Sequence, residues 1–270
     1  MSNPTVDILM ATYNGERFVG EQIESIQHQT YQNWRLLVSD DCSSDGTLDV
    51  VKAYAAKDSR ISVVSEGVRH GGAKENFMSL LVKSCSPYAM FCDQDDVWFP
   101  RKIEASLSKL RGIEGFRPNA PCLVFTDMQV VDSGLNVISP SFERDSNIDP
   151  SRTSFPQVLA QSLGAGCTMI FNRPLIKLMV FNTAYDDMIM HDHWATIVAA
   201  AFGSIGYVDE PLSYYRQHGD NSIGAVSFSV FDWATHMRRI KDSYVDNLKQ
   251  AVLFGSVYGA LLSKPLLDHS

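Results

Sequence analysis

Three carboxylates stand within four residues in the stretch Asp93-Gln94-Asp95-Asp96. Their negative charges repel one another at neutral pH, so a fold rarely gathers them without a cation to bind. Oxygen ligands on a short turn suit a hard divalent ion such as Mg²⁺ or Mn²⁺, which keeps open positions for phosphate oxygens. The competing interpretation is an acidic turn between a strand and a helix, in which Asp96 caps the helix.

The position of this cluster favours the binding interpretation. The apolar run Tyr88–Cys92 predicts a buried strand that ends at the first carboxylate. Open α/β sheets bind their ligands at the carboxyl ends of the strands, which is where these side chains would stand.

Three earlier apolar runs, Val6–Thr12, Trp34–Ser39 and Ile61–Ser65, predict strands that alternate with helical segments. Such alternation predicts an α/β fold with a mostly parallel sheet and right-handed connections. Polar loops follow the first, second and fourth strands and would converge on one sheet edge, where a nucleotide could lie. Neither a dinucleotide-binding glycine fingerprint nor a P-loop is present.

After Arg111 the pattern changes, and the predicted elements become shorter. A strand is expected at Leu123–Asp127, and a hairpin over Val130–Ile138, followed by an irregular loop over Ser139–Thr153. Beyond these we expect a helix at Phe155–Ser162, a strand at Gly166–Phe171, a helix at Asp192–Phe202, short strands at Tyr207–Val208 and Leu212–Arg216, and a helix over Asp232–Leu253.

Composition narrows the class of protein. The chain has 270 residues, 45% of them hydrophobic, which fits one large domain with or without an appendage. A net charge of -8 argues against a nucleic-acid-binding surface. Five cysteines without paired spacing indicate a reducing compartment, and no C-x-x-C suggests zinc. The polar start and the short apolar stretches predict neither a signal peptide nor a membrane span, so a cytoplasmic protein is expected.

Three motifs together resemble the family 2 glycosyltransferases of the GT-A fold. They are Ala11-Thr12-Tyr13-Asn14, Asp40-Asp41-x-Ser-x-Asp-Gly-Thr and the Asp93–Asp96 cluster, each following a predicted strand. The forms Phe-Cys-Asp-Gln-Asp-Asp-Val-Trp and Tyr-Arg-Gln-His-Gly-Asp-Asn are similar to bacterial rhamnosyltransferase-like enzymes that build O-antigen and other surface polysaccharides. The resemblance runs from about Val6 to Asn221.

The resemblance implies a mostly parallel sheet flanked by helices, with a small antiparallel element. It implies a glycosyltransferase domain over 1–225, with a nucleotide-binding half (1–112) and an acceptor-binding half (113–225), and a helical extension over 226–270. The implied reaction is an inverting, metal-dependent transfer of a sugar from a UDP- or dTDP-linked donor, with dTDP-rhamnose as one candidate. The acceptor would be a hydroxyl of a glycan or a lipid-linked saccharide.

Roles for individual residues follow from the matched motifs. Ala11, Thr12 and Tyr13 would edge the nucleobase pocket, and Asp41 would accept a hydrogen bond from a pyrimidine N–H. Asp93 would contact the ribose or the donor sugar, and Asp95 would bind Mg²⁺ or Mn²⁺ at the diphosphate.

Three further residues carry open alternatives. Lys74 stands where the family often has an Arg-Asn pair, so it is a basic candidate on the donor side whose role stays open. His218 could be an additional metal ligand, or a loop histidine that packs on a neighbouring tyrosine. Trp98 could form the floor of the acceptor site or pack in the core.

Inversion needs a base near the acceptor hydroxyl. Asp192, in Met190-His191-Asp192-His193-Trp194, matches the family's acidic base ahead of a helix. Its alternative role is a helix N-cap, and Asp186 and Asp187 are rival bases. The spacing of His191 and His193 points them apart on a helix, so a metal pair is not expected.

Two other classes of protein remain as alternatives. A nucleotidyltransferase would carry a Gly-rich basic loop after the first strand, whereas this loop is Tyr13-Asn14-Gly15-Glu16 followed by Arg17. A sugar-nucleotide-binding protein without catalysis would be expected to lose carboxylates that are intact here.

The C-terminal helix carries basic residues beside apolar ones, which could bring the enzyme to the inner face of a membrane that holds lipid-linked acceptors. Asp242 and Asp246 dilute that charge, so a packing helix or a homodimer contact is the favoured interpretation.

Overall fold

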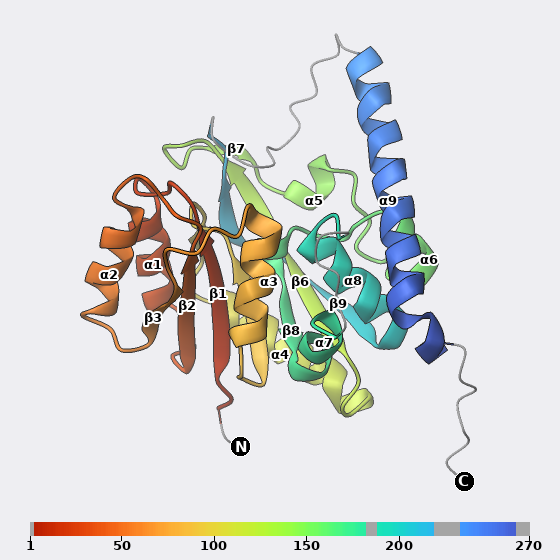
Figure 1. Ribbon diagram of the computed structural model, residues 1–270, viewed down its shortest axis with the longest axis horizontal. Helices are drawn as coiled ribbons and strands as arrows, with labels where there is room; N and C mark the ends of the chain where they lie inside the picture. The colour runs from red at the N-terminus through yellow and green to blue at the C-terminus, as the bar shows by residue number, and fades with distance from the viewer. Residues whose placement is uncertain (1–2, 182–187, 219–232, 263–270) are drawn as a thin grey trace.

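A computed structural model describes residues 3–181, 188–218 and 233–262 of the chain (Figure 1). A nine-stranded sheet forms the centre, in the order β3-β2-β1-β4-β8-β6-β9-β5, and β7 pairs with β6. Helices cover the sheet on both faces, so the predicted α/β architecture is confirmed.

The first four strands are parallel and buried. They are β1 (Val6–Thr12), β2 (Trp34–Asp40), β3 (Ile61–Ser65) and β4 (Tyr88–Cys92). Their apolar runs are bounded by turn residues on both sides, which is why the predicted ends of β1, β3 and β4 agree with the structure.

The second half of the sheet mixes directions. Strand β8 (Ile170–Asn172) is antiparallel to both β4 and β6 (Cys122–Val131), whereas β9 (Ser204–Arg216) is parallel to β6. The short strands β5 (Val97–Trp98) and β7 (Val137–Ser139) are antiparallel to β9 and β6.

Two apolar cores lie on opposite faces of the sheet, because side chains alternate along each strand. On β1, Leu9 belongs to one core, and Ile8 and Met10 belong to the other. Helices α3 (Ala73–Lys83), α7 (Arg173–Met179) and α8 (His191–Phe202) cover the first core, and α1 (Val19–Gln27), α2 (Thr47–Ala55) and α4 (Lys102–Phe116) cover the second.

Several predictions for the second half need correction. The loop over 139–153 contains a helical turn, α5 (Phe142–Asp145), and α6 (Phe155–Ala160) is shorter than expected. A 3₁₀ turn at Gly166–Thr168 precedes β8, so the strand expected at Gly166–Phe171 begins later. The two short strands expected between 207 and 216 form one strand, β9, which pairs with β6 from Ser204 to Arg216 with two register shifts on the way.

The C-terminal helix α9 (Trp233–Leu262) extends beyond the predicted end and runs along one side of the molecule (Figure 1). Phe254 and Tyr258 are buried on it, and the Tyr258 ring stacks on Trp194 of α8 with 5.7 Å between ring centres. Over these residues α9 is a packing helix. The predicted boundary at 225/226 lies outside the described residues.

Among the described residues, no helix combines the length and the hydrophobicity that are needed to cross a lipid bilayer.

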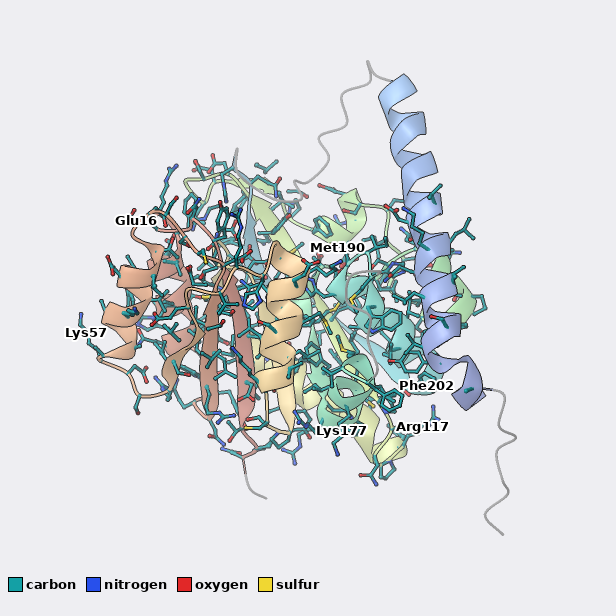
Figure 2. All side chains as sticks on the ribbon, viewed as in Figure 1. Glu16, Lys57, Arg117, Lys177, Met190 and Phe202 are labelled. Carbon is teal, nitrogen blue, oxygen red and sulfur yellow. The ribbon has the colours of Figure 1, made fainter. Side chains whose placement is uncertain are left out.

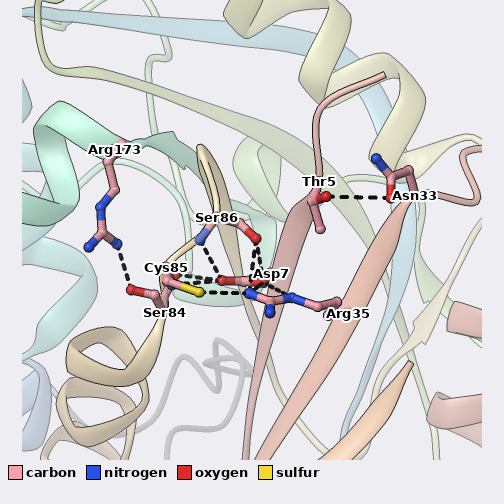
Figure 3. Close-up of polar contacts among 8 residues, drawn as sticks. All are labelled: Thr5, Asp7, Asn33, Arg35, Ser84, Cys85, Ser86 and Arg173. Carbon is pink, nitrogen blue, oxygen red and sulfur yellow. Dashed lines mark hydrogen bonds and ion pairs between the residues drawn. The ribbon is translucent and has the colours of Figure 1, made fainter. Parts of the chain in front are cut away.

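Asp7 interrupts the apolar run of β1, and its carboxylate is fully buried (Figure 3). One oxygen accepts hydrogen bonds from the Arg35 guanidinium at 2.8 Å and the Ser86 hydroxyl at 2.7 Å. The other accepts from the Ser84 hydroxyl at 2.9 Å and from the backbone N–H groups of Cys85 and Ser86. Burial alone would raise the pKa of Asp7, but these hydrogen bonds outweigh it and lower that pKa.

We expect Asp7→Ala to lower the free energy of unfolding by about 3–5 kcal/mol at pH 7, because it leaves a cation and several N–H groups without their acceptor. The pKa of Asp7 is depressed in the folded state, so its contribution is complete above the unfolded value near 3.8 and disappears as the pH falls through the folded value. Urea unfolding at pH 7 and pH 3 measures this. The exposed Glu104→Ala is the control, and an equal loss at both pH values would contradict the prediction.

Candidate functional site

The acidic cluster lies where β4 ends, as predicted. Asp93 and Asp95 are partly exposed, whereas Asp96 is only 1% exposed. One ligand atom each from Asp93, Asp96 and the Cys167 thiol lie within 4.8 Å of one another. The alternative role of Asp96 as a helix cap is wrong, because α4 begins at Lys102 with Arg101 as its N-cap and β5 intervenes.

The carboxyl groups of the cluster repel one another, and the pKa values of Asp93 and Asp96 are raised. Burial raises the pKa of Asp93 to about 7, and the charges on Asp95 and Asp192 contribute. Burial also raises the pKa of Asp96 well above its ordinary value, together with the neighbouring charges on Asp93 and Asp95. A set of oxygen ligands whose charges repel in this way fits a divalent cation, whose own charge would oppose both shifts.

The two predicted metal ligands meet, although they lie 123 positions apart in the chain. Nε2 of His218 is 2.8 Å from Oδ2 of Asp95. The His218 ring also lies against Phe18 of the β1–α1 segment, with 4.8 Å between ring centres. The structure therefore brings a carboxylate oxygen and an imidazole nitrogen to one point, where both could bind an ion.

Arg216, at the end of β9, fixes this arrangement. Its Nε donates to the carbonyl oxygen of Asp95 at 2.8 Å, and its Nη1 donates to that of Ser133 at 2.8 Å. It forms an ion pair with Glu21, and its guanidinium lies 4.6 Å from the centre of the Phe18 ring. One buried side chain thus joins α1, the β6–β7 turn and the acidic loop, which is the segment Asp93–Asp96 after β4.

Asp192 faces the cluster from the start of α8. Its Oδ2 accepts a hydrogen bond from the N–H of Gly166 at 3.2 Å, and its Oδ1 accepts from the N–H of His193 at 2.7 Å. The cap position of α8 belongs to Met190, so Asp192 lies inside the first turn and is not the N-cap. In Figure 2, Met190 and Glu16, which follows β1, both lie in the upper half of the molecule as drawn, although well apart across its width.

Gly166 allows the approach of this helix, because a Cβ there would lie 2.8 Å from the His191 ring. His191 is buried, with its ring stacked on Phe77, and the His193 ring contacts the carbonyl oxygen of Val158 at 2.9 Å. Both histidines therefore have structural contacts. The rival carboxylates Asp186 and Asp187 lie outside the described residues.

The predicted nucleobase residues line the neighbouring strand ends. Ala11 is partly buried in β1, and the hydroxyl of Thr12 donates to Oδ1 of Asp40 at 2.9 Å. Tyr13 is 52% exposed, and its backbone exchanges two hydrogen bonds with the Gln94 amide, which ties the loop after β1 to the acidic loop. The exposed Tyr13 is therefore held at the end of β1, beside the acidic cluster.

Asp41 is largely buried, and its carboxylate accepts hydrogen bonds from the backbone N–H groups of His70 and Gly71. It therefore fixes the loop after β3 next to the loop after β2. Lys74 donates to the carbonyl oxygen of Met188 at 2.7 Å and pairs with Glu75 at 2.9 Å. It thereby joins α3 to the segment that precedes Asp192.

Trp98 is only 2% exposed and belongs to the core on the α4 face. Its backbone N–H donates to the Ser25 hydroxyl at 3.0 Å. Of its two predicted roles, packing in the core agrees with this environment and a floor for the acceptor does not.

Sequence reasoning did not assign Lys102, Cys167 and Arg216 to this site. Lys102 is the buried first residue of α4 and donates to the Ser213 hydroxyl at 3.0 Å, and no local pattern in the sequence marks this lysine as buried. Cys167 follows the small residues Gly164, Ala165 and Gly166, and nothing in that local sequence points to a site. Burial raises its pKa, and so do Asp96 and Asp93, so the group beside them is a neutral thiol.

Comparisons with known proteins all point to glycosyltransferases. The model of the glycosyl transferase family 2 matches residues 7–114. The dTDP-rhamnosyl transferase RfbG of Shigella flexneri is 31% identical over 82% of this chain and 76% of its own length. A UDP-Glc:alpha-D-GlcNAc-diphosphoundecaprenol beta-1,3-glucosyltransferase, WfgD of Escherichia coli, is 29% identical over 67% of this chain and 65% of its own.

Solved structures agree with the fold. TarS 1-349 of S. aureus in complex with UDP-GlcNAc matches with a TM-score of 0.60 at 17% identity, over 97% of this chain and 76% of that one. The mannosyltransferase PcManGT of Pyrobaculum calidifontis, in complex with GDP-Man and Mn²⁺, gives a TM-score of 0.64 at 18% identity, over 97% and 70%. These likenesses confirm the predicted GT-A fold.

Proposed function

The chain belongs to glycosyl transferase family 2, and we propose that this glycosyltransferase moves a sugar from a dTDP- or UDP-linked donor, with inversion and with a divalent cation, to a hydroxyl of a saccharide acceptor. The observation that carries this proposal is the convergence of Asp93, Asp95, His218 and Asp192 at the carboxyl end of β4. The names of RfbG, a dTDP-rhamnosyl transferase, and of WfgD, which uses UDP-Glc, support a donor of this kind. A role in surface polysaccharide synthesis is part of the same proposal.

Each residue has one proposed task. Asp95 and His218 would hold Mg²⁺ or Mn²⁺, which would neutralise the charge that develops on the leaving diphosphate. Asp93 would orient the ribose or the donor sugar, and Tyr13 would stack on the base. Asp41 would stay within reach of a pyrimidine N–H while it holds the loop after β3.

Asp192 would act as the base. Its carboxylate is partly exposed and close enough to Asp93 to influence that group's charge. It would accept the proton of the acceptor hydroxyl as the oxygen attacks the anomeric carbon from the side opposite the diphosphate. Lys74, which holds the segment before α8, would act by positioning this base rather than by contacting phosphate.

The nucleotidyltransferase alternative is not favoured. The loop after β1 offers Arg17, whose guanidinium lies 4.9 Å from the centre of the Phe18 ring, and no Gly-rich basic loop for a triphosphate.

The acceptor would also decide where the enzyme works. A lipid-linked acceptor, such as the one that WfgD's name describes, would place the enzyme at the inner face of a membrane. The arrangement of domains over 1–225 and 226–270 belongs to the same proposal, as does a homodimer contact through α9.

The test is calorimetric titration with UDP, dTDP and GDP, in Mn²⁺ and in EDTA, followed by a transfer assay with the sugar donor of the nucleotide that binds. We expect metal-dependent binding of dTDP or UDP and weaker binding of GDP. If none of the three nucleotides binds, the proposal of a working glycosyltransferase is wrong. If the nucleotide binds with equal affinity in Mn²⁺ and in EDTA, the proposed role of the cation is wrong.

Arg216 should affect the affinity of the proposed cation site, although it does not itself bind the ion. We expect Arg216→Lys to weaken Mn²⁺ binding by about 10–100-fold, because lysine cannot bind the Asp95 carbonyl, the Ser133 carbonyl and Glu21 together. Electron paramagnetic resonance of free Mn²⁺ measures this affinity. Arg101→Lys, on the exposed start of α4, is the matched control. Unchanged affinity in a folded Arg216→Lys protein would contradict the prediction.

A further inference from the structure

Asp93, Asp96 and Cys167 form a set of possible metal ligands that includes neither Asp95 nor His218. One ligand atom from each of the three side chains lies within 4.8 Å of the other two. Two ligands of a single ion with bonds of about 2.0–2.3 Å stand at most about 4.6 Å apart. The three atoms therefore need only a small adjustment to bind one ion together. We call this set the thiol site.

The fold fixes the backbone of each of these residues. Asp93 directly follows β4, and Asp96 directly precedes β5, which pairs with β9. Cys167 lies in the 3₁₀ turn before β8, where the Thr168 hydroxyl donates to the carbonyl oxygen of Ala165 at 2.7 Å. The ligand atoms are thus brought together by three separate elements, and little ordering of the chain is left for an ion to impose.

The buried side of the thiol site lacks hydrogen-bond partners. Asp96 is 1% exposed, and neither of its carboxylate oxygens has a partner among the described residues. The Cys167 thiol is equally buried, and its contact with the sulfur of Met128, at 4.0 Å, is a weak one. A buried carboxylate without donors is costly unless a cation binds it. Asp93 is partly exposed and gives such a cation access from solvent.

The thiol decides which cation fits this site. Mg²⁺ prefers oxygen ligands, whereas a thiolate ligand selects ions such as Zn²⁺. Asp95 and His218 offer an oxygen and a nitrogen but no sulfur, so the two sites differ in the ion that they prefer. When Zn²⁺ binds, a bond between sulfur and the metal replaces the S–H bond of Cys167, and the proton passes to the buffer. No oxidation state changes.

We propose that Asp93, Asp96 and Cys167 form a second cation site, which takes Zn²⁺ or another thiophilic divalent cation and inhibits the enzyme by competing with the donor for Asp93. This ion is distinct from the Mg²⁺ or Mn²⁺ of the reaction. The competition arises because a carboxylate that binds the ion is no longer free to orient the ribose or the donor sugar. The competition rests on the function proposed above, whereas the binding of the ion does not.

The test is a titration with Cd²⁺, a thiophilic probe whose bond to sulfur gives an ultraviolet charge-transfer band. The reference protein carries Cys42→Ser and Cys85→Ser, which removes the two exposed thiols. Without nucleotide, we expect the band to rise until one equivalent of Cd²⁺ has been added. Adding Cys167→Ala should abolish the band. Adding Cys122→Ala, at a buried cysteine of β6, is the matched control and should leave the band unchanged.

Asp96→Asn in the same reference protein tests the carboxylate, and we expect it to weaken Cd²⁺ binding while the band remains. A reference protein without the band, a band that survives Cys167→Ala, or an unchanged affinity in Asp96→Asn would overturn the proposal. X-ray absorption of the Zn²⁺-loaded reference protein needs no variant in the core. It should show one sulfur ligand at about 2.3 Å, and a shell of nitrogen and oxygen alone would also overturn the proposal.

The competition is measured on the nucleotide that binds in Mn²⁺. Added Zn²⁺ should raise the Kd for this nucleotide in the reference protein, and it should raise that Kd less in the Cys167→Ala variant, which keeps Asp95 and His218. Equal increases in both proteins would place the effect of Zn²⁺ at Asp95 and His218 and overturn the competition. If no nucleotide binds to any of these proteins, the proposed function is wrong, whereas the Cd²⁺ band still decides the cation site by itself.

Discussion

Asp192→Asn is expected to lower kcat by about 10²–10⁴-fold and to leave nucleotide binding within about twofold of the wild type. Asparagine keeps the shape of the side chain, and its single oxygen can still accept one of the two hydrogen bonds that come from Gly166 and His193. What it cannot do is take a proton from an acceptor hydroxyl. Steady-state transfer kinetics and calorimetric nucleotide binding on the same preparation measure the two effects.

The controls for this prediction are the rival carboxylates. Asp186→Asn and Asp187→Asn should retain most of the activity. If either of them loses activity while Asp192→Asn keeps it, the base has been assigned to the wrong residue. A loss of nucleotide binding equal to the loss of kcat in Asp192→Asn would indicate a donor-binding role instead, since Asp192 lies within electrostatic range of Asp93.

Asp95→Ala should abolish the metal dependence of nucleotide binding. A cation that bridges the diphosphate contributes several kcal/mol, so we expect the Kd for UDP or dTDP in Mn²⁺ to rise on the order of 10²-fold or more, to the value measured in EDTA. His218→Ala removes the second proposed ligand and should have a smaller effect in the same direction. Titration calorimetry of the wild type and of both variants, in Mn²⁺ and in EDTA, measures these values.

Asp49→Ala, an exposed carboxylate on α2, is the matched control for charge alone. If Asp95→Ala still binds more nucleotide in Mn²⁺ than in EDTA, the ion is held elsewhere, and the cluster of Asp93, Asp96 and Cys167 becomes the next set to test. If Mn²⁺ does not change the Kd of the wild type for the nucleotide, the proposed role of Asp95 as a metal ligand is wrong.

The first half of the fold could be predicted because local sequence signals agree there with tertiary structure. The ends of β1, β3 and β4 coincide with turn residues, and both faces of these strands are covered by helices. In the second half of the fold, pairing between strands that are far apart in the sequence decides which segments are extended. Asp209, Glu210 and Pro211 break the apolar pattern of β9, and the pairing of β9 with β6 on both sides of a register shift carries the strand through this segment.

The site divides in the same way. Asp93 and Asp95 could be found because the motif is contiguous and follows a strand. His218 remained one of two alternatives, because no local pattern shows that it meets Asp95. Lys102 and Cys167 were missed as site residues, because their roles arise from charges that the fold brings near them and not from their sequence neighbours.

The contact between Arg216 and the carbonyl of Asp95 spans 121 positions, and it sets an order of events during synthesis. A ribosome that adds about 5–20 residues per second needs roughly 6–24 s to pass from one residue to the other. Until β8 (Ile170–Asn172) has been translated, which happens before Arg216 is reached, β4 has no neighbour on the side that β8 later covers. An open strand edge of this kind invites pairing with other chains. The nascent chain is therefore most vulnerable to aggregation after its acidic loop has been translated and before β8 follows, and the Arg216 contact that holds this loop forms later still.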